Sequence, residues 1–63
     1  MQEFFNFVLE TIQANGGKVY LTALAAAYGQ PVRFEWLQAA KQRGILEYNA
    51  VIVDGKPNVE IRA

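Results

Sequence analysis

The Asp54-Gly55 pair constrains this chain most strongly, because it separates two segments that have the composition of β-strands. Asp-Gly is a typical two-residue turn of a β-hairpin, since both positions take a positive φ. Residues 45–53 are rich in β-branched and apolar side chains, and residues 58–62 alternate apolar and charged ones. The pattern predicts a C-terminal hairpin whose loop is either confined to Asp54-Gly55 or lengthened by residues 56–58.

Strand alternation predicts which hairpin side chains face a core. In the first strand, one face collects Leu46, Tyr48, Ala50 and Ile52. In the second strand, the inward residues are Val59 and Ile61, and the outward ones are Glu60 and Arg62. Val51 and Val53 fall on the opposite face of the first strand, where an apolar pair is a candidate contact for a partner protein.

Residues 2–15 have the apolar spacing of an amphipathic helix. The stripe at i, i+3, i+4 and i+7 consists of Phe5, Val8, Leu9 and Ile12, with Phe4 beside it. Asn-Gly-Gly at 15–17 ends this helix, because Asn and Gly tolerate the left-handed conformation of a helix cap. We expect a very short strand at 18–21, then a second helix at 22–28 that Thr22 caps and Gly29 ends.

A third helix is predicted over residues 31–43, with Pro31 in its first position and Gly44 just after its end. Helical geometry gathers Val32, Trp36, Leu37 and Ala40 on one side. The opposite side centres on Glu35, Gln38 and Gln42. Phe34 lies toward the exposed side, and two alternatives stay open: an apolar surface contact, or a frayed helix start that lets Phe34 enter the core.

This order of elements resembles the winged helix-turn-helix superfamily. The resemblance is carried by Leu-Thr-Ala-Leu-Ala-Ala-Ala-Tyr-Gly at 21–29, by Pro-Val at 31–32, and by Trp-Leu-Gln-Ala-Ala-Lys-Gln-Arg-Gly-Ile-Leu at 36–46. These segments are similar to the family's small-residue second helix, its Gly-containing turn, and a third helix that ends in Gly before the wing strands. The resemblance implies a single α+β domain over residues 1–63, with a three-helix core and a C-terminal β-hairpin wing.

In DNA-binding members of the family, the third helix enters the major groove and the wing contacts the backbone. The resemblance therefore implies candidate groove residues in the third helix, namely Arg33, Phe34, Gln38, Lys41 and Gln42. It implies Lys56 as the residue at the wing tip, and Lys18 and Thr22 as phosphate contacts near the second helix. Gln38 and Gln42 would pair with adenine edges, and Arg33 or Lys41 with guanine or phosphate. Double-stranded DNA is thus the expected partner, in a transcriptional regulator or a nucleoid-type binder.

The charge balance keeps a second function open. Six Lys and Arg residues face six Asp and Glu residues, so the chain has no net charge to steer it toward DNA. Glu35 also lies in the polar stripe of the third helix. The alternative is a protein-interaction module that uses Phe34, Val51 and Val53 and does not bind nucleic acid. If the chain binds DNA, we expect a homodimer with Phe4 as the contact.

Several classes of function are excluded by what the sequence lacks. Without Cys or His, the chain has no thiol nucleophile, imidazole base or zinc-finger ligand set. Its carboxylates form no acid–base or metal-binding motif, so we expect neither an enzyme nor a cofactor. No run of about eighteen apolar residues predicts a membrane span. The absence of Cys fits a cytoplasmic protein. A further reading takes these residues as one module of a longer polypeptide.

Overall fold

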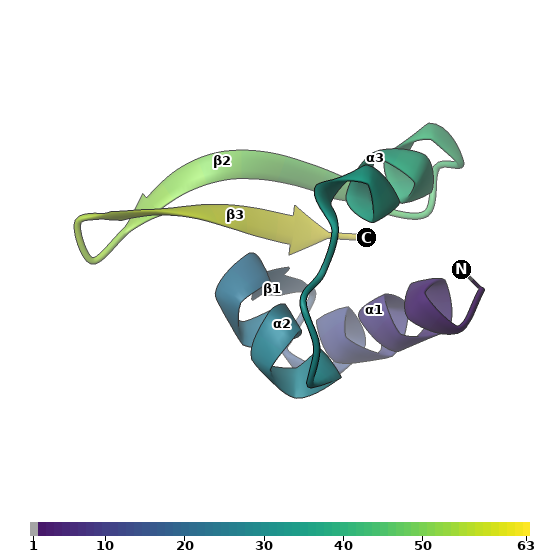
Figure 1. The fold of residues 1–63 in the computed structure, drawn as a ribbon. Helices are drawn as coiled ribbons and strands as arrows, with labels where there is room; N and C mark the ends of the chain where they lie inside the picture. The colour runs from purple at the N-terminus through teal and green to yellow at the C-terminus, as the bar shows by residue number, and fades with distance from the viewer. Residues whose placement is uncertain (1) are drawn as a thin grey trace.

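A three-stranded antiparallel sheet and three helices make up residues 2–63, the part of the chain that the computed structural model describes (Figure 1). The elements in chain order are α1 (Gln2–Ala14), β1 (Lys18–Tyr20), α2 (Leu21–Tyr28), α3 (Phe34–Gln42), β2 (Glu47–Val53) and β3 (Lys56–Arg62). This α+β arrangement confirms the predicted fold class and is compatible with a winged helix.

The strand order is β1-β3-β2, so β3 is the central strand although it comes last of the three in the chain. Antiparallel pairing sets Ile61 of β3 between Val19 of β1 and Tyr48 of β2. β1 pairs only with the C-terminal end of β3, and the turn end of the β2–β3 hairpin extends beyond the helices as an arm (Figure 1). We call residues 52–57 of this hairpin the hairpin arm.

The core lies between the helices and the inner face of the sheet. Its buried side chains are Phe4, Phe5, Val8, Ile12, Val19, Leu24, Leu37, Ala40, Leu46 and Ile61. Aromatic rings pack α3 against the first two helices. The Trp36 ring centroid is 5.1 Å from that of Phe4 and 6.3 Å from that of Tyr28. This packing confirms the predicted inner faces of the first and third helices.

Local backbone signals end the elements where the sequence predicts. Gly44 follows α3 with a φ of 72°, a conformation that costs L side chains energy but not glycine. Its N–H donates to the Lys41 carbonyl (3.0 Å), and the Ile45 N–H donates to the Ala40 carbonyl (2.9 Å), which together form a Schellman motif. Positive φ at Asp54 and Gly55 gives a two-residue hairpin turn, so the lengthened loop is wrong and β3 begins at Lys56.

Two predicted helix starts are wrong. α2 begins at Leu21 and its N-cap residue is Tyr20, which makes no side-chain cap hydrogen bond. Thr22 therefore lies inside the helix, and its Oγ1 accepts a hydrogen bond from Asn58 Nδ2 (3.1 Å). α3 begins at Phe34 rather than at Pro31, because the intervening residues run extended from the end of α2 to the place where α3 packs (Figure 1).

The predicted inward face of the first hairpin strand holds only at its start. Leu46 is buried and Tyr48 is half-buried, but Ala50 is exposed and 70% of the Ile52 surface is accessible. Seven strand residues span about 23 Å, whereas a nine-residue helix such as α3 spans about 13.5 Å. β2 therefore extends farther than the helices that could cover it. The inward-facing side chains at its far end are exposed to solvent.

Candidate nucleic-acid interface

The outer face of α3 presents the polar side chains that the sequence predicts there. Glu35, Gln38 and Gln42 are exposed, while Leu37 and Ala40 on the opposite side are completely buried. The burial of that opposite side fixes how α3 is rotated about its axis. Its two glutamine amides therefore point away from the core, one helical turn apart, each offering a donor and an acceptor.

Positive charge around α3 is held in exposed ion pairs. Arg33 Nη1 lies 3.6 Å from Glu35 Oε1, and both side chains are more than two-thirds exposed. Lys41 Nζ lies 3.7 Å from Glu47 Oε2 and 5.0 Å from the centre of the Tyr48 ring. Exposed pairs of this kind contribute only about 0–1 kcal/mol. Either cation could therefore pair with a phosphate instead of its carboxylate at little cost in free energy.

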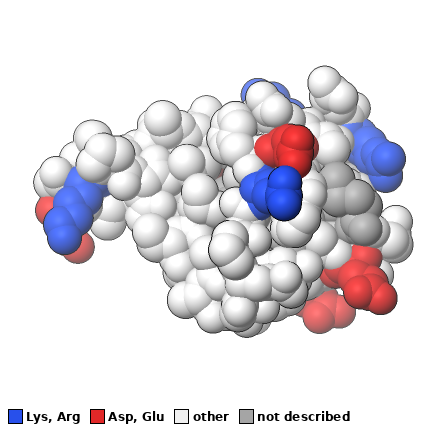
Figure 2. All heavy atoms as spheres, viewed as in Figure 1, with Lys and Arg blue, Asp and Glu red and all other residues white. Residues whose placement is uncertain are grey.

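The remaining cations of the described residues lie in different settings. The Arg43 guanidinium sits 5.3 Å from the centre of the Phe5 ring, at the C-terminal end of α3. Lys56 is exposed and follows directly on the hairpin turn, so it sits at the end of the arm, as predicted. Figure 2 shows charged side chains on this face at the arm's end, over α3 and at the opposite end of the molecule, with a broad uncharged surface between them.

Lys18 and Thr22 are not brought to α3. Lys18 lies in β1 at one edge of the sheet, and Thr22 lies in α2 beside Asn58 of the central strand, whereas α3 contacts β2 at the other edge. Lys18 Nζ is 3.6 Å from Glu60 Oε2, and Arg62 also pairs with Glu60. The Arg62 hydrogen bond holds the pKa of Glu60 below its ordinary value, against partial desolvation and with help from the charges of Arg62 and Lys18. This cluster links β1 to β3 at one edge of the sheet.

Phe34 lies on the surface, which resolves the two alternatives for this residue. Its side chain is 48% exposed, and its ring stands edge-on to Tyr48 with the centroids 5.2 Å apart. Val51 and Val53, the other proposed apolar contacts, are half-buried. Sequence reasoning missed Ile52, the most exposed large apolar side chain among residues 2–63. The length of its strand relative to the third helix was the signal that could have revealed it.

Phe4 is corrected from a surface contact to a core residue. Only 3% of its surface is accessible, because its ring packs against those of Phe5, Tyr28 and Trp36. The ring of Phe4 is thus packed within a single chain and is not available to a second copy. A dimer of this fold needs another surface.

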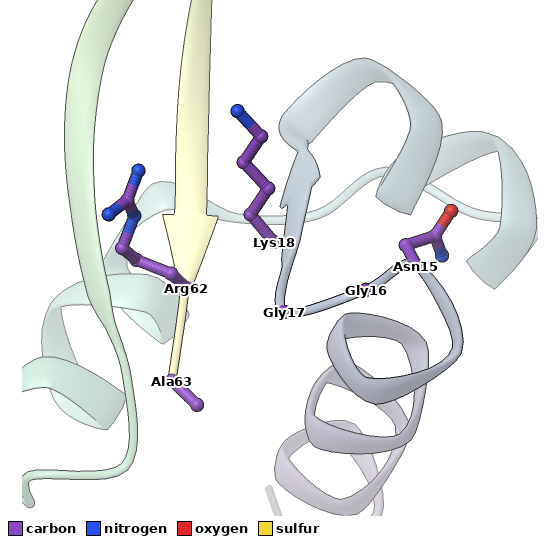
Figure 3. Close-up of a pocket in the computed structure, with 6 residues that line it drawn as sticks. All are labelled: Asn15, Gly16, Gly17, Lys18, Arg62 and Ala63. Atoms are coloured by element: carbon purple, nitrogen blue, oxygen red, sulfur yellow. The ribbon is translucent and has the colours of Figure 1, made fainter.

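One shallow pocket of about 300 Å³ lies where the end of α1 meets the β1–β3 edge. Figure 3 shows its lining residues, with the Lys18 and Arg62 side chains directed away from Gly16 and Gly17. Both of those cations are already engaged with Glu60. Without converging polar groups, the pocket has none of the features that orient a small ligand.

Other classes of site are missing from residues 2–63. No three His, Cys, Asp or Glu side chains gather there as a metal site would require, and none of the helices has the length and apolar character needed to cross a membrane. No family model matches the chain, and comparisons with curated proteins and with solved structures also gave no match. The candidate functional residues are therefore those around α3 and on the hairpin arm.

Proposed function

We propose that this chain is a winged-helix protein that binds double-stranded DNA, with α3 in the major groove and the hairpin arm on the backbone, as a transcriptional regulator or a nucleoid-type binder. The observation that carries the proposal is the outer face of α3. It presents Gln38 and Gln42 to solvent, and its one carboxylate, Glu35, is paired with Arg33. An unpaired carboxylate would repel phosphate. The Arg33 guanidinium has five N–H donors, so it can stay paired with Glu35 while it also contacts a phosphate or a guanine.

Each side chain has a role that its chemistry permits. The Gln38 and Gln42 amides would read adenine, whose N6 and N7 offer a matching donor and acceptor. Lys41 would exchange Glu47 for a phosphate, and Arg33 would contact phosphate or guanine beside Glu35. Lys56 would reach the backbone from the end of the arm, and Phe34 would contact a thymine methyl group.

The affinity should be modest and sensitive to salt. Only three cations, Arg33, Lys41 and Lys56, lie on α3, its N-cap or the arm. Each phosphate contact contributes about −0.9 to the slope of log K against log salt, so we expect a slope of roughly −3.

Fluorescence-anisotropy titration of a random-sequence duplex, at low salt and near physiological salt, tests the proposal. Salt-sensitive binding at micromolar protein would support it, and selection of a preferred sequence would follow. Gln38→Ala with Gln42→Ala should abolish that preference. Gln13→Ala, an exposed amide on α1, is the matched control. Absence of binding at low salt would refute the proposal.

A second candidate function is recognition of another protein, and the exposure of Phe34 favours it. A ring that is 48% exposed beside Tyr48 suits an apolar interface, whose affinity barely responds to salt. Val51 and Val53 would contribute less than Ile52 to such an interface, because they are half-buried and Ile52 is exposed. If this second function is the right one, Phe34→Ala would abolish partner capture, and the chain would not bind duplex DNA even at low salt.

A further inference from the structure

We propose that two copies of this chain pair through the free edge of β2, antiparallel and centred on Ala50, to form one continuous six-stranded sheet. The sheet order leaves β2 at an edge, and no strand of residues 2–63 pairs with its outer side. From Asn49 to Val53 this strand has no charge and no proline. Natural proteins protect exposed edges with such residues, so an edge without them favours strand pairing.

The hairpin turn determines which backbone groups are free. In a two-residue turn, the closing pair, here Val53 and Lys56, is hydrogen-bonded. Antiparallel pairing then alternates, so Tyr48, Ala50 and Ile52 direct their N–H and C=O groups to the outside. Pro57 opposite Ile52 fits this alternation, because a proline has no N–H to offer β2.

Among the symmetric registers near the middle of β2, only one pairs all the outward N–H and C=O groups of Tyr48, Ala50 and Ile52 with those of the second copy. With Ala50 opposite Ala50 of the second copy, Tyr48 lies opposite Ile52 of that copy, and the reverse pair forms on the other side of the twofold axis. Every pair would be of the hydrogen-bonded kind, which gives six backbone hydrogen bonds. A shift by one residue would oppose groups that point toward β3 and lose these bonds.

The same register covers the apolar side chains that the single chain leaves exposed. Ile52 of the second copy would lie against Tyr48, whose ring is already 5.2 Å from that of Phe34. Phe34 and Ile52 are the two exposed large apolar residues within residues 2–63, with 48% and 70% of their surfaces accessible. In this register, Phe34 of each copy would lie near Ile52 of the other, so both residues would be covered on both sides of the twofold axis. Aromatic and β-branched side chains are a favourable cross-strand pair.

Charges support a second copy as the occupant. Glu47, the only charged residue of β2, would face Val53 of the second copy, with Lys56 of that copy in the next strand. Two strand spacings are about 9.6 Å, a distance that long Glu and Lys side chains can bridge. Lys41 beside Glu47 adds positive charge where the acidic turn of the second copy would lie. The two Glu47 carboxylates would sit at opposite ends of the interface.

Sedimentation equilibrium of the full chain from about 1 µM to 1 mM tests the proposal without DNA, so its outcome is independent of the proposed function. We expect a monomer–dimer equilibrium. Ile52→Lys should weaken dimerisation at least about 100-fold, because twofold symmetry removes its burial twice. Ala50→Pro removes an N–H that forms no hydrogen bond with β3, and it should weaken dimerisation about 10- to 100-fold. Asn6→Lys, an exposed position on α1, should change nothing.

The register has its own test, because the chain contains no cysteine. Ala50→Cys should form a disulfide-linked dimer on mild oxidation, since the two introduced thiols would face each other at the twofold axis. Lys56→Cys, which is also exposed but lies at the end of the arm, should cross-link far more slowly. A monomer at 1 mM, a dimer insensitive to Ile52→Lys and Ala50→Pro, or equal cross-linking at both positions would overturn the proposal.

Discussion

The ring of Trp36 in α3 packs 5.1 Å, centroid to centroid, from the ring of Phe4 in α1. Tyr28 of α2 stands edge-on to both rings, so one aromatic cluster joins all three helices. The cluster holds α3 so that its buried side faces the core and its glutamines face solvent. Stability and the candidate interface therefore depend on the same contact.

Phe4→Ala should destabilise the protein by about 3–5 kcal/mol, because it opens a cavity beneath two aromatic rings. That loss is comparable with the whole stability of a domain this small, so the variant should be largely unfolded at 25 °C. Circular dichroism during urea unfolding measures the change. Phe34→Ala is the control: it removes a half-exposed ring and should cost about 1 kcal/mol. Equal losses in both variants would contradict the assigned burial.

Gly44→Ala should destabilise the protein by about 1–2 kcal/mol, because an L side chain pays this cost for a left-handed φ. A Cβ at Gly44 meets no atom within 4 Å, so the penalty would be conformational and not steric. Gly44→Asn should cost less, since Asn tolerates this conformation. Thermal unfolding of the two variants compares them; a Gly44→Asn variant less stable than Gly44→Ala would be inconsistent with this explanation.

Lys56→Ala should weaken binding to duplex DNA by a similar factor on every sequence and reduce the magnitude of the salt slope by about 1. Lys56 is exposed at the end of the arm, where it would contact a phosphate rather than a base. Anisotropy titrations at four or five salt concentrations give the slope. Lys18→Ala should leave it unchanged, because Lys18 lies at the β1 edge with Glu60. A slope that Lys56→Ala does not alter would remove the arm from the interface.

Glu60→Gln should be less stable than the natural sequence at neutral pH, and the difference should shrink in acid. The Arg62 hydrogen bond lowers the pKa of folded Glu60, so its contribution is present above the pKa of the unfolded chain. That contribution is lost as the pH falls through the lowered pKa of the folded state. Urea unfolding between pH 7 and pH 2 tests this, with Glu10→Gln on the exposed side of α1 as the control. A stability difference that is constant with pH would contradict the assigned role.

Local signals in the sequence predicted much of the fold. Gly29, Gly44 and the Asp54-Gly55 turn act within a few residues, and the structure bears out each of them. The apolar stripe of the first helix is also confirmed, except that Leu9 is only half-buried. The Gln38 and Gln42 face was also predictable, because helical periodicity alone separates it from Leu37 and Ala40.

The errors concern relations between distant elements. Pro31 suits a helix start locally, but the end of α2 lies away from the place where α3 packs, so the chain must first run extended. Ile52 alternates correctly with its neighbours, yet its exposure depends on how far the helices extend beneath the strand. Phe4 lies beside the apolar stripe of its helix, and only the positions of Tyr28 and Trp36 make it a core residue.

The position of β3 in the sheet has a consequence for synthesis on the ribosome. β1 and β2 do not pair with each other, and both depend on residues 56–62 for their backbone partners. A nascent chain that has exposed only the three helices and β2 therefore has no sheet, and the apolar inner face of those helices stays uncovered. We infer that folding waits until β3 has left the exit tunnel, so translation sets the earliest moment at which this protein acquires its structure.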